Sequence, residues 1–120
     1  MGMDLKVALA SYTAAEHLKN SLITVSQLLA TVPSYPEAER PGAARMLVSL
    51  LGVVRGDAQR AHQVTAEQPF QRTAEILSEA ISLAESREYN QAAERVGGAI
   101  SQVTTAAQGA WGQLSANGLV

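Results

Sequence analysis

The chain of 120 residues contains no cysteine. Disulfide bonds, thiolate metal sites and cysteine-based catalysis are therefore excluded, and no redox compartment is indicated. Large aromatic side chains are also scarce, with one Phe, one Trp and three Tyr, so alanine and aliphatic residues must supply most of any core. Small core residues let helices approach closely, but each buries little apolar area, and burial stabilises by only about 25 cal/mol per Å².

Charge is sparse as well. Charged residues make up 17% of the chain, below the ~25% that is usual for soluble domains. A monomeric helical bundle normally covers its surface with charge, so the shortfall favours burial of some surface against another subunit. The net charge of −2 argues against a broad contact with nucleic acid, which requires clustered Lys and Arg. We therefore expect a homo-oligomer, with a dimer favoured, and no binding of nucleic acid. A different protein is a further candidate partner.

Long apolar runs are absent. The most apolar stretch, Met46 to Val54, covers about nine residues, which is half of a membrane-spanning helix at best. The short apolar stretch Val7 to Ala10 is too short for a secretory signal peptide. We therefore expect a cytoplasmic protein without membrane contact.

The chain does contain a repeated spacing of apolar residues, at alternating steps of three and four, in four separate stretches. This spacing places each set on one side of an α-helix, and a helix with one apolar side must bury it. The sets are Ala15, Leu18, Leu22, Val25, Leu29 and Val32; Ala43, Leu47, Leu50, Val54, Ala61 and Val64; Phe70, Ala74, Leu77, Ile81 and Ala84; and Tyr89, Ala93, Val96, Ile100, Val103, Ala107, Ala110 and Leu114. We predict an all-α, up-down-up-down four-helix bundle that forms a single domain over residues 1–120, because short connections make sequential helices antiparallel.

Capping residues and prolines set the predicted helix boundaries. Asp4 is a predicted N-cap, and Pro33 ends the first helix because it disfavours helical geometry at the residue before it. A kink is predicted at Pro41 within the second helix, and Asn117–Gly118 ends the fourth because both residues tolerate left-handed dihedrals. The predicted helices span residues 4–31, 36–65, 69–86 and 89–116.

Charged residues support antiparallel packing of the second and third helices. If these helices fold back about residue 67, opposite charges meet at three mirrored positions, Arg60 with Glu75, Arg55 with Glu79 and Arg45 with Glu88. Each exposed pair contributes only ~0.2–1 kcal/mol, so the pairs indicate the register more than they stabilise it. Charges that alternate on solvated faces are the alternative explanation.

Two segments of the chain resemble each other, namely Tyr35–Ala44 and Tyr89–Ala99, with one residue inserted in the second. This similarity suggests that the fold consists of two duplicated helical hairpins. The segment 87–93 (Arg-Glu-Tyr-Asn-Gln-Ala-Ala) also resembles the turn of tetratricopeptide repeats, although the Trp, Gly and Pro markers of that repeat are missing.

The fourth predicted helix carries the main candidate interface. A ridge of small side chains recurs at every fourth position, at Ala93, Gly97, Ser101, Thr105 and Gly109. Glycine inside a helix costs ~1 kcal/mol relative to alanine. A chain tolerates several such losses when the backbone must lie close to another surface. We therefore expect close helix packing here, either within the bundle or across a dimer axis.

Gly98 and Gly112 add two more glycines to the same helix, and Trp111 lies one step off its apolar stripe. Partly exposed Trp is a frequent interface anchor, and a plug at the end of the bundle is the alternative role. The candidate interface residues are Gly97, Ser101, Thr105, Gly109 and Trp111.

His17 and His62 are the only histidines, and His17 is predicted to be an ordinary surface residue. A di-metal site in a helix bundle needs Glu-x-x-His pairs, which this sequence lacks. The segment Glu16–Ser21 is similar to the His-x-x-Lys-Gly segment of histidine phosphotransfer domains, which are also four-helix bundles. Here Lys19 follows the histidine by two residues instead of three, and Asn20 replaces the glycine. The resemblance would make His17 the residue that carries the phosphoryl group.

Arg55 and His62 resemble the Arg–His pair of the all-helical HEPN nucleases, in which two such helices meet at a dimer interface to form a ribonuclease site. Their spacing of seven residues places both on one helical face. The resemblance implies that Arg55 and His62 are catalytic, but Gly56 stands where the family has Asn.

No Gly-rich phosphate loop, ordered Ser/His/Asp set or clustered carboxylate pair occurs in the sequence. We therefore expect no cofactor and no metal. The favoured interpretation is a non-catalytic helical interaction or scaffold protein that self-associates. A HEPN-like ribonuclease and a histidine phosphotransfer domain are the alternatives.

Overall fold

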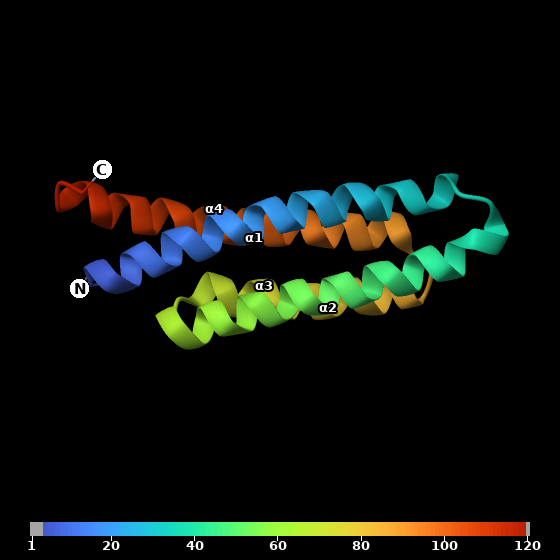
Figure 1. The fold of residues 1–120 in the computed structure, drawn as a ribbon, viewed down its shortest axis with the longest axis horizontal. Helices are drawn as coiled ribbons and strands as arrows, with labels where there is room; N and C mark the ends of the chain where they lie inside the picture. Colours follow the sequence, from blue (N-terminus) through green and yellow to red (C-terminus); the bar gives the residue numbers. More distant parts are fainter. Residues whose placement is uncertain (1–3, 120) are drawn as a thin grey trace.

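The computed structural model describes residues 4–119 and shows an all-α bundle of four long helices (Figure 1). Each helix runs antiparallel to the next along the chain, and α1 also packs against α4. The predicted up-down-up-down four-helix bundle is therefore confirmed. The helices are α1 (Leu5–Thr31), α2 (Arg40–Thr65), α3 (Gln68–Glu85) and α4 (Tyr89–Ala116), with two short 3-10 helices, η1 (Val32–Ser34) and η2 (Glu37–Glu39), between α1 and α2.

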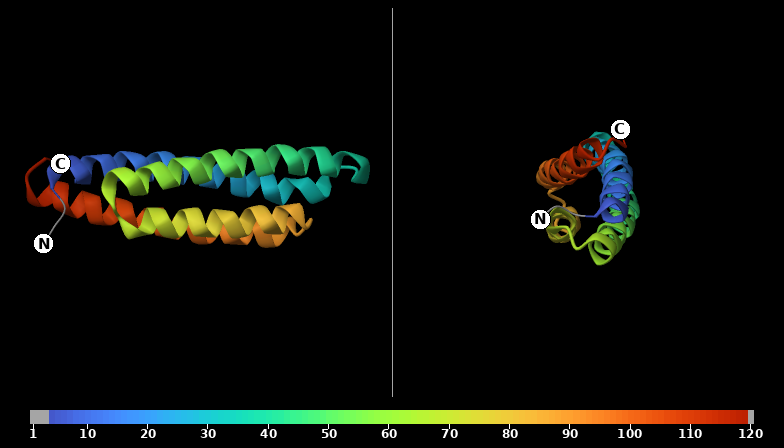
Figure 2. Two further views of the ribbon diagram at one scale, coloured as in Figure 1. Left: turned by 90° about the horizontal axis from the view of Figure 1, so that it is seen from below. Right: turned by 90° about the vertical axis from the view of Figure 1, so that its left-hand side faces the viewer.

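Seen along its length, the bundle has α2 and α4 at opposite corners (Figure 2), and its dimensions are 54 × 22 × 17 Å. Both described ends of the chain lie at the same end of the bundle (Figure 1). At that end α1 and α4 extend beyond the α2–α3 turn, since α3 has 18 residues and α4 has 28. Ala8, Ala110 and Leu114 are buried there, outside the main core cluster.

The start of α1 agrees with the predicted N-cap, Asp4. The Asp4 carboxylate accepts a hydrogen bond from the Val7 N–H at 2.9 Å, which satisfies one of the backbone donors left free at a helix start. All six apolar residues predicted for the inner side of the first helix are buried, including Val32, which lies in η1.

No helix in the part of the chain from 4 to 119 is long and apolar enough to span a bilayer.

The start of α2 differs from the prediction. Pro41 lies in the first turn of α2, where its missing N–H leaves no hydrogen bond broken. The predicted kink at Pro41 is therefore wrong. The extended backbone of Tyr35 and Pro36, with ψ of 153° and 144°, separates the two 3-10 helices. The Arg40 side chain donates hydrogen bonds to the carbonyls of Tyr35 and Pro33, at 2.9 and 3.1 Å, and ties this connection to α2.

The buried sides of α2 and α4 are rotated slightly from the predicted ones. Leu51 is fully buried while Leu50 is only partly buried, and Val64, predicted to be inside, is exposed. Apolar residues occupy two adjacent positions in both helices, and the choice between them depends on where the neighbouring helices lie. The observed inner residues follow a regular three-four spacing, at Ala44, Leu47, Leu51, Val54, Ala58, Ala61 and Thr65 in α2, and at Tyr89, Ala92, Val96, Ala99, Val103, Ala106, Ala110 and Leu114 in α4.

None of the three predicted α2–α3 charge pairs forms; Arg45, Arg55 and Arg60, with their expected partners, all lie within the described residues. Arg60 pairs instead with Asp57, which lies one turn away on its own helix. Glu79 faces α4 and pairs with Arg95 at 3.7 Å. Arg60 and Glu79 thus each pair with a different residue from the one predicted.

Candidate interaction surfaces

The residues predicted as an interface on α4 lie at the surface. Ser101, Thr105 and Gly109 are exposed, Gly97 is partly exposed, and Trp111 is 47% exposed. A Cβ atom placed on Gly97 or Gly109 would meet no other atom within 4 Å. These glycines therefore do not serve close packing inside the subunit, and that half of the prediction for the ridge is wrong.

The five predicted residues do not form one patch. Gly109 and Trp111 are two residues apart, so they point about 200° apart around the helix. Trp111 faces α1, where its ring centroid lies 5.6 Å from that of Tyr12, with the ring planes tilted by 42°. The sequence analysis missed Tyr12, because the contact depends on the offset between two helices far apart in the chain.

The Tyr12–Trp111 pair borders a shallow groove of about 450 Å³ between α1 and α4, with Glu16 and Lys19 on the α1 side. Leu5 and Leu9 lie on the same side of α1 as Tyr12, because they precede it by seven and three residues. Both leucines are exposed, Leu9 by 59%. The end of the bundle at which α1 and α4 extend beyond α2 and α3 thus carries exposed apolar side chains.

The side of α4 that faces away from the bundle consists of small, uncharged residues. Gly98, Thr105 and Gly112 recur on it at seven-residue intervals, and all three are exposed. A Cβ atom on Gly98 or Gly112 would also meet nothing within 4 Å. We refer to Gly98, Ser101, Thr105, Gln108, Gly109 and Gly112 as the α4 outer face. The sequence has no ionisable side chain from Val96 onward.

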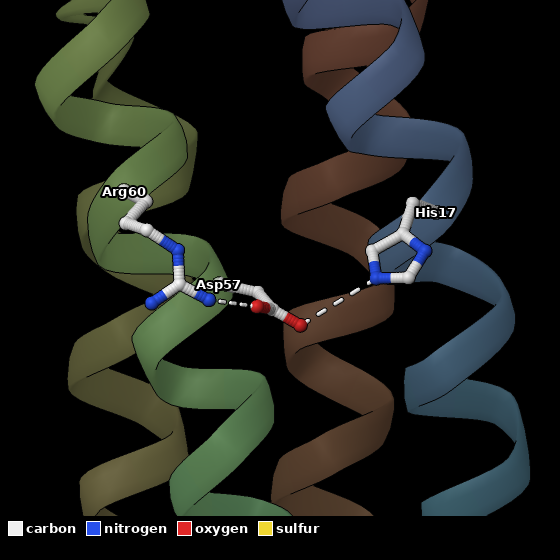
Figure 3. Close-up of polar contacts among 3 residues, drawn as sticks. All are labelled: His17, Asp57 and Arg60. Carbon is white, nitrogen blue, oxygen red and sulfur yellow. Dashed lines mark hydrogen bonds and ion pairs between the residues drawn. The ribbon is translucent and has the colours of Figure 1, made fainter.

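His17 belongs to a charged cluster that joins α1 to α2 (Figure 3). Its Nε2 atom lies 3.5 Å from a carboxylate oxygen of Asp57, and the other oxygen of Asp57 pairs with Arg60. The His17 side chain is largely exposed, in agreement with the predicted surface position, whereas Asp57 is more deeply placed. The sequence did not indicate Asp57, because the pairing depends on the register of α1 against α2.

Arg55 and His62, the candidate nuclease pair, both engage the α3 side of α2. Arg55 Nη1 donates a hydrogen bond to Ser78 Oγ at 3.2 Å. His62 Nδ1 lies 3.2 Å from the Glu67 carbonyl oxygen, in the turn between α2 and α3. In this turn Ala66 adopts a left-handed conformation, with φ of 58°. Both side chains thus have contacts that hold α2 to the segment that follows it.

Residues 4–119 place no three His, Cys, Asp or Glu side chains where they could hold a metal ion together. Neither protein-family models nor curated proteins nor solved structures gave a match to this chain.

Proposed function

We propose that this protein is a non-catalytic helical scaffold that self-associates as a dimer through the α4 outer face. The observation that carries the proposal is the open space around Gly98, Gly109 and Gly112. Each glycine destabilises an exposed helix by ~1 kcal/mol relative to alanine. Nothing within the subunit compensates for this loss, whereas close approach of a second helix would.

The order of residues along α4 suits an antiparallel contact with a second copy. If a two-fold axis passes through Thr105, Gly98 of one copy lies opposite Gly112 of the other, and Ser101 lies opposite Gly109. Small residues then face small residues along the contact, so the two backbones can approach closely. The absence of charge on this face agrees with the depletion of charged residues at the centre of protein interfaces.

Leucine substitutions at the glycines test the proposal cleanly. Because a side chain at Gly98 or Gly109 points into open space, Gly98→Leu and Gly109→Leu should leave the subunit folded while they separate the two backbones. Ser82→Leu is the matched control, since Ser82 is also exposed but lies on α3, outside the α4 outer face. We expect sedimentation equilibrium to show a lower native mass for the α4 variants and an unchanged mass for Ser82→Leu. A wild-type chain that stays monomeric at high concentration would rule the proposal out.

Two assays separate this proposal from the enzymatic alternatives. A scaffold should release no product from RNA, with or without Arg55→Ala and His62→Ala. It should also take no phosphoryl group from an acyl-phosphate donor, with or without His17→Gln. RNA cleavage or phosphoryl transfer that disappears in these variants would replace the scaffold proposal. The cytoplasmic location expected from the sequence stays a prediction.

A further inference from the structure

A second candidate contact surface runs along the outside of α2. It faces neither α1 nor α3, the helices on which α2 packs. Met46 is 76% exposed and Val53 is 61% exposed, and these large apolar side chains lie two turns apart on the same side of the helix. With Glu39 and Arg60 they form a series at seven-residue intervals, Glu39, Met46, Val53 and Arg60, which we call the α2 outer stripe. This is the repeat by which two helices pack along a common seam.

Small residues fill the positions between these large ones. Gly42, Ser49 and Gly56 each follow a member of the stripe by three residues, so the two series together have the three-four spacing of a helix–helix contact. Gly42 has no atom near its missing side chain. The outside of α2 thus alternates large and small side chains, while the inside of the same helix has its own three-four series in the core.

The neighbouring surface of α1 extends this apolar area. His17 and Asp57 fix the register of α1 against α2. Leu28 follows His17 by eleven residues, about three turns, along α1. Met46 precedes Asp57 by the same number of residues along α2. Because the helices are antiparallel, Leu28 and Met46 lie beside each other, and Leu28 is 40% exposed.

The charged members of the α2 outer stripe are the two at its ends, and the exposed Arg45 adjoins Met46. Between Met46 and Val54 the helix has no ionisable residue, whereas Glu39 and Arg60 end the stripe with opposite signs. An apolar centre with a charged rim is typical of protein interfaces. Glu39 is the N-cap residue of α2 and Arg60 lies near its C-terminus, so these opposite charges are complementary to the same segment turned end for end.

We propose that a second copy of this chain binds the α2 outer stripe, with the two α2 helices antiparallel about a two-fold axis. One register places Met46 of one copy beside Gly56 of the other, Val53 beside Ser49, and Arg60 beside Gly42. Every large side chain then lies over a small residue; at Gly56 it also meets the Arg60 guanidinium, which lies 3.5 Å from the position that a Cβ atom would take. Glu39 of the second copy lies one turn from Arg60, which thus has an acidic neighbour in each chain.

This inference rests on the proposed self-association and adds a second contact to it. Since α2 and α4 lie at opposite corners of the bundle, one subunit can hold a different copy at each face. The assembly therefore exceeds a dimer when both contacts form. Disabling one contact leaves dimers joined by the other.

Native mass tests the two contacts separately. Met46→Lys combined with Val53→Lys should reduce the mass of the assembly to that of a dimer, because lysines would face the opposing helix across the axis. Both positions are exposed, so the subunit should keep its far-UV circular dichroism. Gln59→Lys combined with Gln63→Lys is the matched control, because it adds the same two charges at exposed positions of α2 outside the stripe. Adding Gly109→Leu to the Met46/Val53 variant should then give monomers.

The outcomes distinguish the two proposals. An unchanged mass for the Met46/Val53 variant, together with a reduced mass for Gly109→Leu, overturns the α2 contact and leaves the proposed function standing. The reverse pattern supports the α2 contact and removes the role of α4. A monomeric wild-type chain overturns both.

Disulfide trapping tests the register, and the absence of native cysteine makes it unambiguous. In the proposed register Ser49→Cys of one chain lies beside Val53→Cys of another, within the distance that a disulfide requires. Two Val53→Cys chains would be offset by about 6 Å along the axis, in addition to the separation of the helices. We expect a mixture of the two single variants to cross-link under mild oxidation, and Val53→Cys alone to cross-link poorly. Efficient cross-linking of Val53→Cys alone, with none specific to the mixture, would overturn the proposed register.

Discussion

Replacing the exposed glycines of α4 with alanine should stabilise the isolated subunit. Gly98, Gly109 and Gly112 lie inside a helix, and a Cβ atom on each would meet no neighbour within 4 Å. Alanine therefore brings no clash, and it restricts the unfolded chain more than glycine does. The substitution should raise the free energy of unfolding at every one of the three positions.

The size of the effect follows from helix propensity. Each replacement should contribute ~0.5–1 kcal/mol, so the triple variant should gain about 2 kcal/mol if the three effects add. This is a large fraction of the ~5–15 kcal/mol that stabilises a typical domain. For a chain of this length each kcal/mol raises the melting temperature by roughly 3–6 °C, so the triple variant should melt about 6–12 °C higher.

Urea unfolding at a protein concentration low enough to prevent association measures this gain, with far-UV circular dichroism and the fluorescence of Trp111 as probes. Gly118→Ala is the matched control, because Gly118 has φ of +70°, where alanine is strained by ~1 kcal/mol or more. It should bring no stabilisation. A triple variant that is no more stable than the wild type would show that the glycines have a role within the subunit. If the α4 contact is real, the same variant should associate more weakly while its subunit becomes more stable.

Two further changes test the core. Leu51→Ala should destabilise the subunit by ~2–5 kcal/mol, because Leu51 is fully buried, whereas Leu50→Ala at the partly buried neighbouring position should cost clearly less; equal losses in urea unfolding would contradict the observed register of α2. Ser11→Ala should stabilise by ~1 kcal/mol, because the buried Ser11 hydroxyl has no hydrogen-bond partner, while Ser101→Ala at an exposed position removes no such penalty. A loss of stability for Ser11→Ala would indicate that its hydroxyl is hydrogen bonded.

The fold could be predicted because apolar residues recur at three- and four-residue steps in each of the four helices. In α1 the predicted series through Leu18, Leu22 and Val25 is buried, although the apolar Ile23 beside it is exposed. In α2 the adjacent leucines at 50 and 51 offer two sides, and propensity does not choose between them. The choice is made by the positions of α1 and α3, which no local pattern encodes.

The surface was predictable only in part. Glycines at unexpected helical positions indicated α4, and the interface predicted on that helix stays a prediction. The Tyr12–Trp111 contact and the His17–Asp57 pair were missed, because each joins residues from different helices. Such contacts depend on the axial offset between helices, which is set by whole-helix packing and by the length of the connections. The α2 outer stripe was not identified from the sequence, because the exposure of Met46 and Val53 depends on how α2 packs in the bundle.

The chemistry of the α4 outer face is less polar than its residue names suggest. Thr105 Oγ1 donates a hydrogen bond to the Ser101 carbonyl at 3.1 Å, and the neighbouring Thr104 bonds to the Ile100 carbonyl at 2.8 Å. Hydroxyls that bond back to their own helix are already satisfied, so what these threonines offer to a partner is chiefly their methyl groups. With glycine backbone on either side and no charge nearby, a facing helix would lose little hydration on approach. Such a face has lower helix propensity and fewer charges than an exposed helix normally has. Close contact with a second helix would compensate for the lower propensity and would need few charges.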